Sequence, residues 1–131
     1  MPEQGGDNWE HSLAQTGGVS FLNNTLVRVL SIGAIVGLLV CLPLLGYFIR
    51  PSSGLIILHY NVYFGVDLLG VWWQAYALPF LGGTLLLGHF FLARRFYMRS
   101  ERIASYLMLL SAGMLSFGVL IASVSIAFIN Y

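Results

Sequence analysis

The chain has 131 residues, of which 58% are hydrophobic and only 8% are charged, and its formal net charge is +1. Globular proteins carry about 25% charged residues, and a chain this short has too little interior to bury so much apolar surface. These figures exclude a soluble domain and predict that a lipid bilayer surrounds the protein. The charge balance gives no basic excess for a nucleic-acid partner, and the single Cys41 excludes a disulfide within the chain.

Three long runs without fixed charge predict three membrane-spanning helices. Arg28 and Arg50 bracket the first run, whose 21 residues match the roughly 30 Å hydrocarbon core at 1.5 Å rise per residue. Unpaired backbone groups are costly in lipid, so helices are expected rather than strands. We therefore expect an all-α membrane protein with a structured outer loop between helices 1 and 2. Its transmembrane domain would cover 28–131, with spans at about 29–49, 68–93 and 103–129.

Residues 1–27 are polar and contain glycine, which predicts a flexible N-terminal tail before the transmembrane domain. At the end of this tail, Asn23, Asn24 and Thr25 are residue types that cap the start of a helix.

The positions of the arginines predict how the spans are oriented across the membrane. Four of the six arginines lie in the short segment 94–102, and basic residues near span ends are retained on the cytoplasmic side. This predicts a multi-pass protein of the cytoplasmic membrane with its N-terminus in the cytoplasm and its C-terminus outside. The four arginines are also candidates for contact with lipid headgroups: Arg94, Arg95, Arg99 and Arg102.

Small residues at helical spacing predict close helix packing. The first span contains the GxxxG pair Gly33 and Gly37, which Cys41 continues. In the third span, small residues fall within about 60° of one another at 100° per residue. Packing within one chain is one interpretation, and self-association or binding of a second membrane protein is the other. The third-span residues are Ser105, Ala112, Ser116, Ser123 and Ala127.

Pro43 and Pro79 interrupt the first and second predicted spans, and Gly82 and Gly83 follow the second proline. Proline removes a backbone hydrogen bond and kinks a helix. One interpretation is that the bundle splays open toward the outside and forms a cavity there. The other is that the kinks only improve packing.

The connection 51–67 between the first two spans is apolar and aromatic, although a plain connector would be polar. We expect it to fold back onto the outer interface as a short extended segment. Aromatic rings with polar tips are typical of recognition sites, and His59 with Asp67 would form a proton-transfer or metal pair if the loop brings them together. Interfacial anchoring, turn formation and helix capping are the alternatives. The candidates are His59, Tyr60, Asn61, Tyr63, Phe64 and Asp67.

His89 is the ionisable residue inside a predicted span, which makes it a functional candidate. One interpretation is structural, with a neutral histidine that reaches interfacial water or a serine on a neighbouring helix. The other is haem ligation, because one histidine per chain in a symmetric dimer supplies two axial ligands.

The strings LHYNVYFGVDLLG at 58–70 and ERIASYLMLLSA at 101–112 flank the second span. With them, residues 28–131 resemble a group of short bacterial three-span membrane proteins with an HYN-x-YFG-x-D loop, a group without an assigned activity. This resemblance implies a bacterial cytoplasmic membrane and a recognition role for the loop.

The sequence contains no catalytic constellation, and it gives no reason to expect a metal or a cofactor. It predicts an integral membrane protein without enzymatic activity, an accessory or scaffold subunit. Such a subunit would bind a membrane-protein partner through the 51–67 loop and the small-residue helix faces. The alternative is a haem-binding or small-solute transport protein that uses His89 and the proline-kinked outer half of the bundle.

Overall fold

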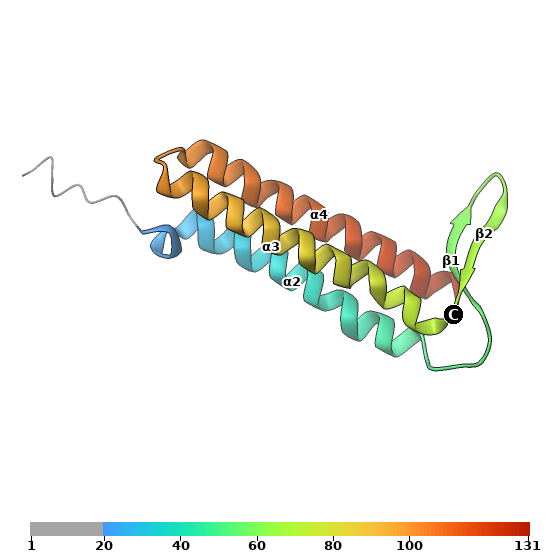
Figure 1. The fold of residues 1–131 in the computed structure, drawn as a ribbon. Coiled ribbons are helices and arrows are strands. Elements are labelled where there is room, and N and C mark those ends of the chain that lie inside the picture. The colour runs from blue at the N-terminus through green and yellow to red at the C-terminus, as the bar shows by residue number, and fades with distance from the viewer. Residues whose placement is uncertain (1–19) are drawn as a thin grey trace, which may run out of the picture.

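A computed structural model describes residues 20–131. Three long helices run side by side as an elongated bundle, and a two-stranded hairpin lies across one end of it (Figure 1). The helices are α2 (Thr25–Phe48), α3 (Ala77–Met98) and α4 (Arg102–Ile129), and the strands are β1 (Ile56–Asn61) and β2 (Gly65–Gly70). Two short 3-10 helices complete the fold, η1 (Phe21–Asn23) and η2 (Trp72–Tyr76).

The three helices are long and apolar enough to cross a membrane. The spans Thr25–Phe48, Trp72–Met98 and Arg102–Ile129 have mean hydropathies of 2.5, 1.5 and 2.2. Large hydrophobic side chains are exposed along all three, among them Leu39, Phe80 and Phe117. An apolar exterior of this kind fits a multi-pass membrane protein, because lipid solvates such side chains.

The structure is mostly helical, as expected, but it also contains a small two-stranded sheet, and the second span begins later than expected. Residues 65–70 form β2, so the apolar run from residue 68 begins as a strand and the membrane-length segment begins at Trp72. Pro79 consequently lies in the first turn of α3 rather than in mid-span, and there its missing N–H removes no helical hydrogen bond. Only Pro43 lies well inside a described helix.

The expected tail of 1–27 is too long. Residues 1–19 lie outside the described residues, but residues 20–27 are ordered as η1 and the first turn of α2. Phe21 is only 5% exposed and packs edge-to-face on Phe90 and Tyr97. Asn24 caps α2 as expected, since its Oδ1 accepts hydrogen bonds from the backbone N–H groups of Leu26 and Val27.

Helix α4 is the central helix, which packs along both α2 and α3, whereas α2 and α3 contact each other little. Its small residues face the other two helices and are at most 3% exposed: Ser105, Ala112, Ser116, Ser123 and Ala127. The hydroxyl groups of the three serines have no hydrogen-bond partner among the described residues. This face of α4 is therefore buried by packing within the chain.

The two glycines of the GxxxG pair lie in different surroundings. A Cβ atom at Gly37 would lie 3.5 Å from the Cβ of Ser116, so Gly37 faces α4. Gly33 is exposed, and a Cβ atom there would have no neighbour within 4 Å. The buried face of α2 instead follows a seven-residue spacing, Val27, Ala34 and Cys41, as in left-handed helix packing. The pair does not pack as one motif.

Candidate functional site

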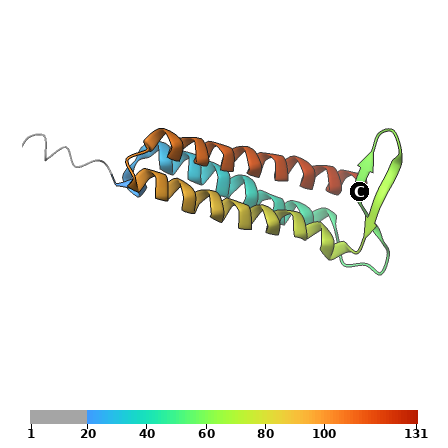
Figure 2. The ribbon, with the colours of Figure 1, turned by 45° about the horizontal axis from the view of Figure 1, so that its top comes forward.

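The hairpin lies across one end of the bundle, and its tip extends sideways past α4 (Figures 1 and 2). We call this the hairpin end. The opposite end, where the α3–α4 connection and the start of α2 meet, is called the arginine end. It carries Arg28, Arg94, Arg95, Arg99 and Arg102.

Strands β1 and β2 pair antiparallel from Ile56 opposite Gly70 to Asn61 opposite Gly65. Gly65 has a φ of 80°, a conformation that glycine adopts without strain, and it closes a three-residue loop of residues 62–64. The Oδ1 of Asn61 accepts a hydrogen bond of 2.9 Å from the N–H of Tyr63 and shapes this turn. The tip therefore has a defined conformation.

An isolated two-stranded hairpin is only marginally stable, and here the bundle supports it. Ile56 and Leu58 of β1 pack against a buried cluster at the ends of the helices, formed by Leu45, Ile49, Ala75 and Ile126. The side chain of Asn130 binds both backbone groups of Ile57. The hairpin is thus fixed to the ends of α2 and α4 as one body with the helices.

At the junction of β2 and η2, Gly70 is closely surrounded by the side chains of Gln74 and Leu58. A Cβ atom there would overlap the side chains of Gln74 and Leu58. Gln74 in turn accepts a hydrogen bond of 2.9 Å from the N–H of Val71. This contact sets the direction in which the chain leaves the hairpin and enters α3.

His59 and Asp67 meet on the hairpin, with 2.6 Å between the His59 Nδ1 and the Asp67 Oδ1. The pairing of the strands brings these two residues to adjacent positions across the sheet, where the ladder is locally irregular. Both side chains are exposed, at 61% and 43%, so the pair adds only about 0–1 kcal/mol to stability. Among residues 20–131, no group of three His, Cys, Asp or Glu residues could hold a metal ion.

A cavity of about 600 Å³ lies beneath the hairpin, between β1, β2, α3 and α4. His59 and Tyr60 line it from the hairpin, while Leu78 and Leu81 line it from α3 and Ile126 from α4. It is mostly apolar, with a polar edge at His59. The hollow at the hairpin end lies where the hairpin covers the ends of the helices.

The tip of the hairpin is apolar and almost fully solvent-exposed. Val62 is 84% exposed, Tyr63 91% and Phe64 85%. Of the remaining sequence candidates, Tyr60 is exposed on β1 and Asn61 shapes the turn. The structure therefore gathers all six loop candidates on one hairpin, although His59 and Asp67 lie in the strands and Tyr63 and Phe64 lie at the tip.

His89 lies apart from this group, on α3 and toward the arginine end. Its Nδ1–H donates a hydrogen bond of 2.8 Å to the carbonyl oxygen of Leu85, one turn earlier in the same helix. The backbone of its own helix therefore satisfies this nitrogen, rather than a serine of a neighbouring helix. His89 and His59 are on different parts of the molecule and do not form a common site.

Sequence reasoning missed two contributors to this site. Asn130 fixes the hairpin from the end of α4, and its amide side chain after a long apolar run was the available signal. Val62 belongs to the exposed tip together with Tyr63 and Phe64. Its position between two recognised candidates was the only indication in the sequence.

Neither a protein-family model, nor a curated protein, nor a solved structure matches this chain. The proposals below therefore rest on the geometry and chemistry of its own residues.

Proposed function

We propose that the protein is an accessory subunit of a membrane-protein assembly and that it docks on its partner through the hairpin tip. The proposal rests on the exposure of Val62, Tyr63 and Phe64 at the tip of a hairpin that the bundle holds in place. Contiguous apolar surface of this kind is typical of interaction sites. Because the bundle holds the hairpin in one conformation, binding orders fewer residues and its entropic cost is lower.

The position of the tip favours a neighbour in the plane of the membrane. The hairpin extends sideways past α4, so its tip overhangs the lipid-facing side of the bundle (Figure 2). A partner that packed beside α4 would meet both the tip and exposed side chains of that helix, such as Ile129, which lines the cavity beneath the hairpin. Burial of Val62 and Phe64 in such an interface would contribute about 1.5–3 kcal/mol each.

The chemistry near the tip favours a protein over lipid as the occupant. The His59–Asp67 pair lies on the strands that lead to the tip, and the outer edge of β2 carries backbone groups that no third strand pairs among the described residues. Deep insertion into hydrocarbon would desolvate these groups at a high cost. A protein surface can offer them hydrogen bonds. The proposal assigns no catalytic step to the subunit.

A photo-crosslinking amino acid at position 63 tests this proposal in intact cells. We expect one discrete adduct with a membrane protein, and none from the same group at the equally apolar Met98, which is exposed at the arginine end. Replacement of Val62, Tyr63 and Phe64 by serine should abolish co-purification of that partner in mild detergent. The subunit itself should remain folded, because the tip contributes nothing to the buried cluster.

Three results would contradict the proposal. Adducts formed only with lipid would make the tip a membrane anchor, and adducts formed only with a second copy of the chain would make it a self-association site. Unchanged co-purification of the partner with the serine variant would show that the tip does not contribute to docking.

A further inference from the structure

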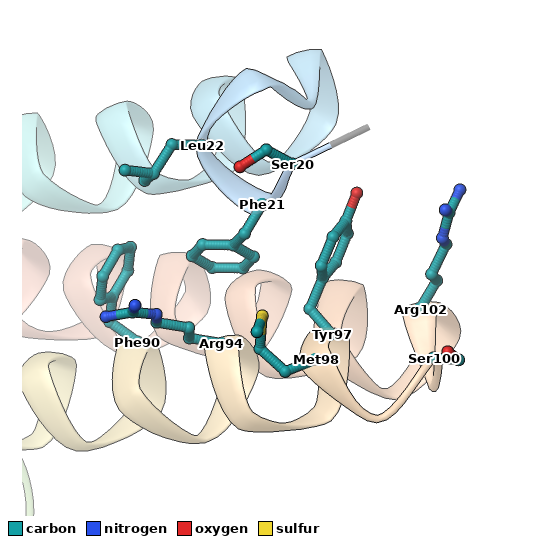
Figure 3. A pocket seen from close by; sticks show the side chains of 9 residues that line it. All are labelled: Ser20, Phe21, Leu22, Phe90, Arg94, Tyr97, Met98, Ser100 and Arg102. Atoms are coloured by element: carbon teal, nitrogen blue, oxygen red, sulfur yellow. The ribbon is translucent and has the colours of Figure 1, made fainter. Parts of the chain in front are cut away.

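A second cavity, of about 510 Å³, lies at the arginine end, between η1, α3 and the start of α4. It is remote from the hairpin. Its walls combine aromatic and aliphatic side chains with two arginines and two serines (Figure 3). The residues used below are Phe21, Leu22, Phe90, Tyr97, Arg94 and Arg102.

The apolar wall of this cavity is held in place. Phe21 packs edge-to-face on Phe90 at 5.4 Å between ring centroids and on Tyr97 at 5.3 Å. Asn24 donates hydrogen bonds to the hydroxyl groups of Tyr97 and Tyr106 and so ties the start of α2 to α3 and α4. The cavity is therefore formed before any ligand arrives, which favours binding.

Two cations flank this wall. In Figure 3 the side chains of Arg94 and Arg102 lie on either side of the Phe21 and Tyr97 rings. The Arg102 guanidinium is 5.6 Å from the centre of the Tyr97 ring, a cation–π contact. Within residues 20–131, neither arginine forms an ion pair with a carboxylate, including the neighbouring Glu101. No described carboxylate neutralises either charge, so both can attract an anion.

We propose that this cavity binds the headgroup of an anionic phospholipid, with Arg94 and Arg102 attracting the headgroup and the aromatic wall contacting the upper part of an acyl chain. Guanidinium groups match phosphate oxygens in geometry and charge. The cavity lies at the end of two membrane-length helices, where the headgroup layer would be. Leu22 and Phe90 provide an apolar surface that a free phosphate ion would not use.

Native mass spectrometry of the purified full-length protein tests this proposal. The protein would be released from mixed micelles that contain equal amounts of phosphatidylglycerol and phosphatidylcholine. We expect selective retention of phosphatidylglycerol and a loss of about fivefold in its affinity for each of Arg94→Gln and Arg102→Gln. The matched control is Arg28→Gln, which removes the same charge at the same end but outside the cavity. It should leave retention unchanged.

A further variant and a competitor separate a lipid from a simple anion. Leu22→Ser removes apolar wall at an exposed position that the fold does not need, and it should also weaken retention. Inorganic phosphate at millimolar concentration should not displace the lipid. Equal losses in Arg28→Gln and Arg94→Gln, equal retention of the two lipids, or full displacement by inorganic phosphate would each overturn the proposal.

Discussion

Asn130 binds the backbone of Ile57 with both ends of its amide side chain. Its Oδ1 accepts a hydrogen bond of 2.8 Å from the Ile57 N–H, and its Nδ2 donates one of 2.7 Å to the Ile57 carbonyl oxygen. The same Nδ2 also donates to the carbonyl oxygen of Ile126. The Asn130 side chain thus makes the two backbone hydrogen bonds at Ile57 that a third strand beside β1 would make. Asn130 thus links the hairpin directly to α4, the helix past which the hairpin tip extends.

Asn130→Ala should therefore loosen the hairpin without unfolding the bundle. The Ile57 amide loses its acceptor, so its hydrogen exchange should accelerate by about tenfold or more, in line with the loss of one to two hydrogen bonds. Hydrogen–deuterium exchange of the purified protein measures this effect. Asn23→Ala, at an exposed asparagine of η1, is the control. Unchanged exchange over residues 56–70 would show that the apolar contacts alone hold the hairpin.

Asn24→Ala should lower the stability of the arginine end. The substitution removes the cap of α2 and the hydrogen bonds to Tyr97 and Tyr106, the latter only 2.8 Å long. Loss of a cap costs about 1–2 kcal/mol, so the midpoint of thermal unfolding in detergent should fall by several degrees. The same measurement on Asn23→Ala should show little change. Equal midpoints for the two variants would refute the structural role given to Asn24.

Gly82 is a point of close helix contact, and Gly88 on the same helix is not. A Cβ atom at Gly82 would lie 2.9 Å from the Val119 Cγ2 and 3.1 Å from the Leu38 Cδ1, whereas one at Gly88 would have no neighbour within 4 Å. Gly82→Ala should destabilise the bundle by about 1–3 kcal/mol through overpacking. Gly88→Ala should be neutral or stabilising by up to about 1 kcal/mol. Thermal unfolding of the pair in detergent tests this, and the reverse order of stabilities would contradict the packing.

The clustering of arginine predicts the orientation of the bundle. Five arginines lie at the arginine end and only Arg50 lies near the hairpin end, so the arginine end is expected in the cytoplasm. A cysteine introduced at Ser53 should react with a membrane-impermeant thiol reagent in intact cells, and one at Arg99 should react only after lysis. The native Cys41 is fully buried and should not contribute. If Arg99→Cys is labelled in intact cells and Ser53→Cys is not, the orientation is the reverse of the one predicted.

The hairpin marks the limit of prediction from sequence. The apolar run from residue 68 has the composition of a span, yet Leu68 and Leu69 pair with β1. Strand pairing depends on a partner strand, whose position local composition does not reveal. The same limit explains Gly33, which belongs to a recognisable motif but lies on the exposed side of α2.

The sequence by itself determined that three helices of membrane length exist and that the two ends of the bundle carry unequal numbers of arginines. Both follow from the cost of placing charge and unpaired backbone in hydrocarbon, which each segment carries irrespective of its neighbours. Only the tertiary structure decided that His59 meets Asp67, that Asn130 supports Ile57 and that Phe21 closes a cavity beside Arg94. Residues 57 and 130 are 73 positions apart in the chain. Such contacts depend on how whole helices pack, and no local pattern specifies that packing.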